Sequence, residues 1–377
     1  MGSLARRFCL CSNMALLLLV ELLQPSYAQE KSRDVRGDVY EGGARAHEAG
    51  DYGRAIALYS EAIQLNPREP AAYNGRGIAY LEKGDLDRAI ADLNKAIRLA
   101  PRRAECYYNR GRALYKKGVL DKALIDIEKA LEINPRFTFA YWSRGTIYVD
   151  RGEYEKALAD WNKAIDLEPN SASPRIDRGT TYAHLGKYKE ALADEEEALR
   201  LDPRSWRAYE ARACIFANMG QYTKALADYS KAILISPRLA TLYAGRGEIY
   251  QMIVKPENCL RDYTRALQLD PNLVEVYLRR AQVYQARGEL EKAIEDCSAM
   301  VTLSPQSADG YACRGFCYLS KRDYKKSIRD LTEAIRLGAK EASVYENRAS
   351  AYRGIHEEEK AAEDERKAEE LSKENGR

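Results

Sequence analysis

The sequence predicts an all-α fold, an α-solenoid built from antiparallel helix pairs. Three observations support this. Prolines recur every 34 residues, glycines recur about halfway between them, and small residues recur in the same frame. A fixed period of this length is typical of stacked helical repeats. The prolines stand at positions 67, 101, 135, 169, 203, 237, 271 and 305.

Ten consecutive repeats follow when each proline is set at position 32 of a 34-residue frame. No linker or low-complexity block interrupts them. They cover 36–69, 70–103, 104–137, 138–171, 172–205, 206–239, 240–273, 274–307, 308–341 and 342–375. A short lead-in over 29–35 precedes the first repeat.

The sequence pattern of each repeat predicts two helices joined by a tight turn. Position 8 is Gly or Ala in all ten repeats, position 20 is Ala in eight, and position 27 is Ala in nine. These small residues allow two helix backbones to approach closely. Position 15 is Gly in seven repeats, which suits a turn that ends the first helix. The proline then ends the second helix.

The seventh and eighth repeats depart from the frame. Val254 replaces the turn glycine and Pro256 follows it, while Cys259 and Met300 replace alanines. We therefore expect looser or bent packing over residues 252–300.

These in-frame positions resemble the tetratricopeptide repeat (TPR) family, and the resemblance covers residues 36 to about 375. It implies a right-handed superhelix whose concave groove holds peptide segments of partner proteins. It also implies a non-catalytic scaffold or adaptor. The fold class alone does not identify a partner.

Position 7 is Arg and position 23 is Asp in repeats two to ten. The first repeat lacks both and has Gly42 and Leu58 instead. Helical periodicity places both charges at the seam between the paired helices. A half-buried charge is costly alone and tolerated when it is paired. The sequence therefore predicts nine ion pairs within repeats: Arg76–Asp92, Arg110–Asp126, Arg144–Asp160, Arg178–Asp194, Arg212–Asp228, Arg246–Asp262, Arg280–Asp296, Arg314–Asp330 and Arg348–Asp364.

Two alternatives concern these charges. The arginines could form a ladder for an anionic ligand, but each has a matched carboxylate that can accept a bidentate contact. In the fifth repeat, Arg175 and Glu195 replace an apolar pair, which suggests a second, swapped ion pair.

The resemblance to TPR proteins also implies where a peptide would bind. Positions 2, 5, 9 and 12 of the first helices line the groove in that family. We expect a peptide-binding surface at Tyr108, Arg112, Tyr115, Phe139, Trp142, Thr146 and Ile176. Aromatic residues with one arginine resemble an interaction hot spot. The alternative is that these side chains pack along the inner wall of the stack.

Two family devices are not matched. Positions 5 and 9 lack the Lys or Arg with Asn that a carboxylate clamp needs. Only Asn109 and Asn347 occupy the site of an inner asparagine ladder.

Charge and cysteine content exclude several classes of function. The formal net charge is +3, which gives no electrostatic case for nucleic-acid binding. Six cysteines lie beyond the N-terminal segment, with no CxxC spacing and no clustered histidines. Neither a metal site nor a disulfide scaffold is expected, and the cysteines are interpreted as small buried hydrophobic residues.

The N-terminus resembles a secretory signal peptide over residues 1–28. Arg6 and Arg7 precede the apolar stretch MALLLLVELL, and Ser26 to Ala28 offers small residues for cleavage after Ala28. We expect an exported protein, periplasmic or secreted, with no stable membrane span. An uncleaved interfacial segment is the alternative.

The sequence thus predicts a non-catalytic scaffold that binds other proteins or peptide segments and needs no cofactor. Two rivals remain. One is a scaffold that binds its own copies. The other is a thiol hydrolase built on Cys214 and His184, with Asp177 one turn away.

Overall fold

The structure is a computed structural model that describes residues 37–375. These residues form helices and the turns between them, with no strand in the described range. None of the helices described is both long enough and apolar enough to cross a membrane. The all-α class predicted from the 34-residue period is therefore confirmed. The chain divides into two compact parts, one ending at Thr181 and the other beginning at Tyr182, and each is treated by itself.

The N-terminal part opens with a helix over residues 37–48. The helices that follow are α2 (Tyr52–Leu65), α3 (Pro70–Lys83), α4 (Leu86–Leu99), α5 (Ala104–Lys116), α6 (Leu120–Ile133), α7 (Thr138–Asp150) and α8 (Tyr154–Leu167). Helix α9 (Ser173–His184) crosses the boundary between the two parts.

The C-terminal part continues the same alternation of first and second helices. It contains α10 (Tyr188–Leu201), α11 (Trp206–Asn218), α12 (Tyr222–Ile235), α13 (Ala240–Met252), α14 (Pro256–Leu269), α15 (Val274–Ala286), α16 (Leu290–Leu303), α17 (Ala308–Ser320), α18 (Tyr324–Arg336), α19 (Ala342–Arg353) and α20 (Glu358–Asn375).

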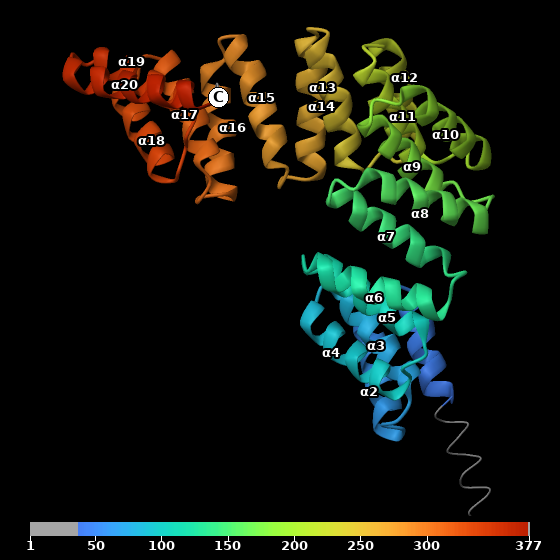
Figure 1. Cartoon of the computed structure of the whole chain (residues 1–377). Coiled ribbons are helices and arrows are strands. Elements are labelled where there is room, and N and C mark those ends of the chain that lie inside the picture. The colour runs from blue at the N-terminus through green and yellow to red at the C-terminus, as the bar shows by residue number, and fades with distance from the viewer. Residues whose placement is uncertain (1–36, 376–377) are drawn as a thin grey trace, which may run out of the picture. The chain divides into compact units, whose positions relative to one another are not determined.

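Small residues bring the two helices of a repeat together. A Cβ atom at Gly111 on α5 would lie 2.8 Å from Ile127 Cγ1 on α6. At Gly145 on α7, it would lie 3.0 Å from the ring of Trp161 on α8. Large side chains of the second helix thus pack directly on glycine in the first, and α5 and α6 lie side by side (Figure 1). This close packing forms the core of each repeat.

The turn between the helices adopts a left-handed conformation at position 15. Gly118 has a φ of +81°, and Val254, at the same position of the seventh repeat, has a φ of +55°. Val254 N donates to Gln251 O at 3.1 Å, much as Gly118 N donates to Tyr115 O at 2.8 Å. The turn at Val254 thus keeps the backbone conformation of the glycine turns. The backbone is strained there, because a β-branched residue is disfavoured at a positive φ.

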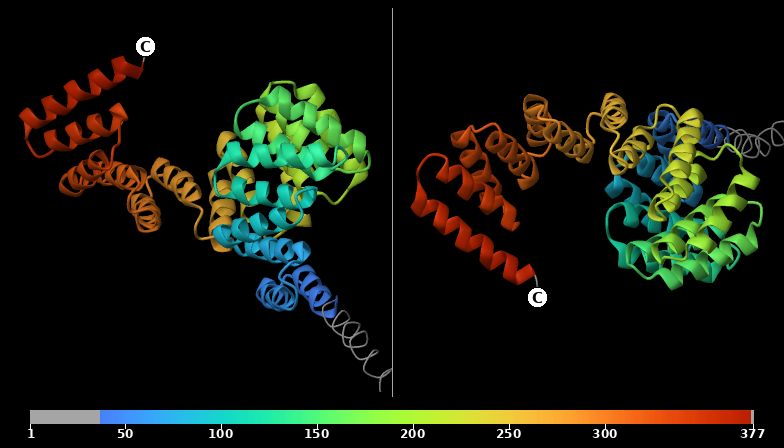
Figure 2. Two further views of the ribbon diagram at one scale, coloured as in Figure 1. Left: turned by 60° about the horizontal axis from the view of Figure 1, so that its bottom comes forward. Right: turned by 90° about the horizontal axis from the view of Figure 1, so that it is seen from above.

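Several first helices of successive repeats contact each other within each part. In the N-terminal part, α3 contacts α5, and α5 contacts α7. In the C-terminal part, α15 contacts α17, and α17 contacts α19 (Figure 2). The structure records no comparable approach between second helices of the described repeats. The first helices therefore form the inner side of the stack locally, which is where the family resemblance places a peptide.

One expectation about the cysteines was wrong. Cys297 on α16 and Cys313 on α17 form a disulfide with their Cα atoms 5.7 Å apart. Cys106, Cys259 and Cys317 are buried free cysteines, whereas Cys214 is exposed. The sequence did not show the bridge because its two residues lie in different repeats, at a spacing of 16 that fits no short cysteine motif.

Candidate functional site

The repeated arginine and aspartate meet within repeats in the same geometry. In Arg110, Nε and Nη2 each donate a 2.6 Å hydrogen bond to the carboxylate of Asp126. In the eight pairs that lie within one part, the shortest N–O distance is 2.6–2.7 Å, and the aspartates are buried. The ninth pair, Arg178 and Asp194, has one residue in each part and stays a prediction, as does Arg175 with Glu195.

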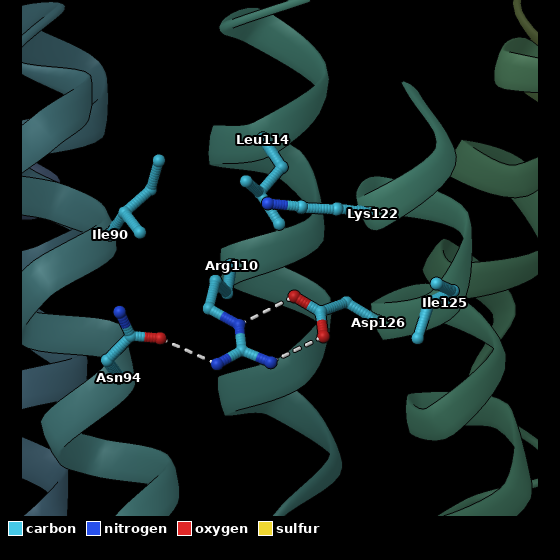
Figure 3. Close-up of a pocket in the computed structure, with 7 residues that line it drawn as sticks. All are labelled: Ile90, Asn94, Arg110, Leu114, Lys122, Ile125 and Asp126. Atoms are coloured by element: carbon cyan, nitrogen blue, oxygen red, sulfur yellow. Dashed lines mark hydrogen bonds and ion pairs between the residues drawn. The ribbon is translucent and has the colours of Figure 1, made fainter. Parts of the chain in front are cut away.

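Seven of the nine arginines also donate a hydrogen bond to the preceding repeat, a contact that we did not predict. Arg110 Nη1 donates a 2.6 Å hydrogen bond to Asn94 Oδ1 on α4 (Figure 3). Six further arginines donate to the same position, number 25 of the repeat before: Arg76 to Ser60, Arg178 to Asn162, Arg246 to Ser230, Arg280 to Thr264, Arg314 to Ser298 and Arg348 to Thr332. One guanidinium thus joins three helices.

The two remaining arginines have a glutamate at the same position of the repeat before, with an electrostatic effect on the arginine. Glu128 precedes Arg144 by 16 residues, and Glu196 precedes Arg212 by 16. The pKa of both arginines is raised, first by the hydrogen bond to the aspartate of the same repeat, and Glu128 and Glu196 contribute. A polar residue 16 positions before each arginine was the sequence signal that could have revealed this contact.

The flat face of the guanidinium is also occupied. The tyrosine at position 4 lies three residues before the arginine on the same helix. Arg144 Cζ lies 5.6 Å from the ring centroid of Tyr141, and Arg110 Cζ lies 5.8 Å from that of Tyr107. The guanidinium N–H groups already donate hydrogen bonds, and one face of the guanidinium lies on a tyrosine ring. These arginines therefore have little capacity left to bind an anionic ligand.

A hollow of about 350 Å³ lies beside Arg110, between α4 and α6 over α5 (Figure 3). Its wall combines apolar side chains with the Arg110–Asp126 pair. The lining residues are Ile90, Asn94, Arg110, Leu114, Lys122, Ile125 and Asp126. Ile125 is 64% exposed at its edge. This surface belongs to the second-helix side, opposite to the predicted peptide-binding side.

On the inner side, most of the predicted peptide-binding residues contact neighbouring helices. Tyr115 Oη donates to Asp150 Oδ2 at 2.6 Å, and the ring of Tyr108 lies 4.8 Å from that of Phe137. Burial raises the pKa of Tyr115 to about 12, and Asp150 contributes, so the phenol remains a donor. Tyr115 therefore helps to join the third and fourth repeats, and Tyr108 packs on the last residue of its own repeat, as the packing alternative anticipated.

The side chains of Trp142 and Arg112 also donate hydrogen bonds to neighbouring helices. Trp142 Nε1 donates to Asp177, and Arg112 Nη2 donates to Glu82 at 3.1 Å. Thr146 Oγ1 donates to the Trp142 carbonyl at 3.2 Å. Trp142, Arg112 and Thr146 keep part of their surface open to solvent.

Two predicted residues differ sharply in exposure. Ile176 is only 4% exposed, so it presents no surface to a ligand, contrary to its predicted role. Phe139, on α7, is 55% exposed. Phe139 and Trp142 are three residues apart on the same helix and share a face. They form one aromatic surface of the predicted set, in which Phe139 is the most exposed residue.

The proposed catalytic thiol lies in a setting that disfavours its ionised form. Cys214 Sγ lies 3.2 Å from Tyr229 Oη. Desolvation raises the pKa of the Cys214 thiol, the contact with Tyr229 lowers it only in part, and the carboxylates of Glu210 and Glu248 raise it further. A nucleophilic cysteine requires the opposite shift. The geometry thus gives the hydrolase rival no support.

Family models described as tetratricopeptide repeat match residues 43–104, 78–136, 176–201 and 262–295. A further model, described as TPR repeat, matches 145–186 and 213–253. Together the matches cover more than half of the chain. No curated protein sequence matches it.

Solved structures of repeat proteins resemble the chain. A tetratricopeptide repeat protein from Parabacteroides merdae ATCC 43184 is 24% identical, with a TM-score of 0.55, over 64% of this chain and 95% of that one. This likeness shows the fold. TTC0263, a thermophilic TPR protein in Thermus thermophilus, is 25% identical over 48% of this chain and 99% of that one, with a TM-score of 0.43. YrrB, a TPR protein with an unusual peptide-binding site, is 27% identical over 48% and 92%, with a TM-score of 0.39.

Proposed function

Because the chain belongs to the tetratricopeptide repeat family, which supports a role as a protein-interaction scaffold, we propose that it is a non-catalytic adaptor. In this proposal, the inner faces of α5 and α7 bind an extended peptide segment of a partner protein. The single observation that carries the proposal is Phe139, an aromatic side chain that is 55% exposed on a first helix.

The surroundings of Phe139 support this choice. Trp142, on the same face of α7, is held by its hydrogen bond to Asp177, so it offers a fixed aromatic surface. Arg112 on α5 is bound to Glu82 and still has 33% of its side chain exposed. An apolar peptide side chain could pack on the two rings while Arg112 contacts a carbonyl or carboxylate of the peptide. Aromatic and arginine side chains are those that most often dominate binding energy.

The test compares two exposed apolar residues on opposite sides of one part of the chain. Phe139 on α7 is at a position that the family resemblance assigns to the inner side, whereas Ile125, which is 64% exposed, is on the second helix α6. Peptides would be selected from a random displayed library on the wild-type protein. Their affinities would then be measured for Phe139→Ala and Ile125→Ala by fluorescence anisotropy.

We expect Phe139→Ala to weaken binding by about tenfold or more and Ile125→Ala to leave it unchanged, because an anchor residue is typically worth more than about 1.4 kcal/mol. Equal affinity for wild type and Phe139→Ala would overturn the proposal. If only Ile125→Ala loses affinity, the hollow beside Arg110 is the interaction surface instead. Sedimentation of each variant at several concentrations separates peptide binding from self-association.

Export is a further part of the proposal. The predicted signal peptide, residues 1–28, lies outside the described residues, and the proposal rests on its sequence alone. Sequencing the N-terminus of the protein recovered from its native cell would test it. Cleavage after Ala28 is expected, and an intact Arg6–Arg7 segment would contradict it.

A further inference from the structure

Three cysteines gather where the eighth and ninth repeats meet. Cys297 lies on α16, and Cys313 and Cys317 lie on α17. The three sulfur atoms lie within 4.8 Å of one another, and the residues are 0%, 8% and 1% exposed, respectively. In the part of the chain that the structure describes, no other three His, Cys, Asp or Glu side chains cluster as a potential metal-binding group.

Two of the three are bonded, and the third is within reach. Cys297 and Cys313 form the disulfide, and the Cα separation of 5.7 Å is usual for such a bond. Cys317 Sγ lies 4.0 Å from Cys297 Sγ. Cys313 and Cys317 are four residues apart on one helix, so both face the same side. Cys297 can therefore be bonded to either of them with small side-chain movements.

The repeat geometry explains why these positions meet. Cys297 is at position 24, where other repeats have a large side chain such as Trp161. Trp161 Nε1 donates to Thr181 Oγ1 at 3.2 Å, and Thr181 is at position 10 of the next repeat. Cys317 is at that same position 10. The contact between positions 24 and 10 is thus a property of the stack, and here both positions carry sulfur.

We propose that Cys297, Cys313 and Cys317 form a thiol–disulfide exchange site that links the eighth and ninth repeats when oxidised and releases them when reduced. Oxidation by a small disulfide, such as oxidised glutathione, joins Cys297 to Cys313. The small disulfide accepts two electrons and the two thiol protons to become two thiols. In the exchange step, the small fraction of Cys317 that is present as thiolate attacks Cys297 Sγ, and the Cys297–Cys313 bond breaks. Cys313 leaves as a thiolate and takes up the proton that Cys317 loses.

A metal site is the alternative interpretation of three clustered cysteines. Metal binding requires thiolates, and burial raises the pKa of Cys317 to about 11, with Asp296 contributing. A structural zinc site also needs a fourth ligand, and the cluster contains only these three residues. A disulfide with one neutral thiol suits this buried setting better, because it carries no charge.

The link would control the end of the array. In a stack of repeats, each repeat is stabilised mainly by its neighbours. Helices α17–α20 join the rest of the C-terminal part mainly through the α16–α17 contact, beside a smaller contact between α15 and α17. A covalent bond across this contact ties the last two repeats to the eighth, and reduction leaves them to packing alone.

The bonding pattern is tested by peptide mapping of the full chain equilibrated with oxidised glutathione, then alkylated under denaturing conditions. We expect a Cys297–Cys313 crosslink, with Cys106, Cys214 and Cys259 alkylated. In Cys313→Ser, we expect a Cys297–Cys317 crosslink instead, and in Cys297→Ser neither crosslink. Free Cys297 in the wild type, or no crosslink in Cys313→Ser, would overturn the exchange site. So would a stoichiometric metal ion that protects all three thiols.

The effect on the array is tested by hydrogen exchange of α17–α20 in oxidised and reduced protein. Closing a loop of this length favours the folded state by roughly a hundredfold, so we expect exchange by local unfolding to accelerate by up to that factor on reduction. In Cys297→Ser, these helices should exchange at the rate of the reduced wild type, and adding reductant should not change that rate. Equal rates for oxidised and reduced wild type would refute the link between redox state and order in the last repeats.

Discussion

Arg110 of the third repeat donates a 2.6 Å hydrogen bond to Asn94 of the second. Asn94 lies 16 residues before the arginine, and Asp126, its ionic partner, lies 16 residues after it. The guanidinium therefore joins the second helix of one repeat to both helices of the next. It couples neighbouring repeats as well as closing its own, and this coupling is what makes a linear array cooperative.

Replacing Arg110 should destabilise the N-terminal part strongly. Asp126 is 4% exposed, and Arg110→Ala would leave its carboxylate buried without its partner. Removing one partner of a buried pair typically costs about 3–5 kcal/mol, and because Arg110 retains some exposure we expect about 3 kcal/mol. Asn94→Ala should cost about 1 kcal/mol, the usual value of one hydrogen bond. Urea unfolding followed by circular dichroism measures both.

The matched control is Arg88→Ala. Arg88 pairs with Asp85 at 3.2 Å, but its side chain is 69% exposed. Its loss should cost less than about 1 kcal/mol, as exposed pairs do. A double-mutant cycle between Arg110 and Asn94 should show a coupling of at least about 0.5 kcal/mol. Strict additivity would mean that the inter-repeat hydrogen bond contributes nothing.

The sequence predicted the parts of the fold that depend on the period. The position of the second helix in the first eight repeats follows from the prolines, and the interval of 16 residues from Arg110 to Asp126 is visible in the same frame. The backward contact to Asn94 was overlooked, although the same interval separates the two residues. Polar residues such as Asn94, Ser230 and Thr264 share only the ability to accept a hydrogen bond, so no single residue type marks the position.

The candidate site was less predictable, because exposure depends on what packs above each residue. Phe139 and Ile176 were both assigned to the inner face by position, yet the structure leaves Phe139 exposed and buries Ile176. The Cys297–Cys313 bridge depends on contact between two repeats, and no linear motif records such a contact. Residue spacing along one helix could not supply either fact.

Val254→Gly should stabilise the C-terminal part by about 1 kcal/mol. Val254 has a φ of +55°, where a residue with a Cβ branch is strained by roughly 1–2 kcal/mol. Glycine removes this strain but loses more backbone entropy on folding, which offsets part of the gain. The melting temperature and the urea midpoint should both rise.

The converse substitution tests the same reasoning in the N-terminal part. Gly118 has a φ of +81°, and a Cβ atom there would meet nothing within 4 Å. Gly118→Ala should therefore cost about 1–2 kcal/mol through backbone strain alone. If Val254→Gly lowers stability while Gly118→Ala does not, the strain argument is wrong for both turns.

Glu210 should make the C-terminal part less stable as the pH rises. Burial raises the pKa of its carboxyl above the ordinary value of 4.5, and Arg207 opposes this only partly. Between 4.5 and the raised pKa, the folded protein binds more protons than the unfolded one, so this contribution to stability is lost as the pH increases through that window. Glu210→Gln should reduce the slope, since Glu248 also has a raised pKa and keeps its own contribution. It should stabilise the protein at pH 7 by about 1 kcal/mol or less, because the side chain is half-exposed.

The comparison for Glu210 is Glu346→Gln on α19, an exposed glutamate. Unfolding free energies measured from pH 4 to pH 7 should differ in slope between wild type and Glu210→Gln, and coincide between wild type and Glu346→Gln. Parallel curves for all three proteins would show that Glu210 titrates normally.

Asn109→Asp should destabilise the N-terminal part, because it places a carboxylate at a buried polar contact. Asn109 is 6% exposed, and its Nδ2 donates to Asn74 Oδ1 at 3.1 Å. Aspartate cannot donate when ionised, so the amide oxygen of Asn74 would face a negative charge. We expect a loss of about 2–3 kcal/mol at pH 7.

The same position in the tenth repeat supplies the control. Asn347 there donates to Ser343 O of its own helix at an exposed site, so Asn347→Asp should cost less than about 1 kcal/mol. The new carboxyl at 109 should have a raised pKa in the folded state, so the lost stability should return as the pH falls below that value. Equal destabilisation by the two substitutions, or a loss at 109 that does not change between pH 7 and pH 4, would contradict a buried link between the second and third repeats.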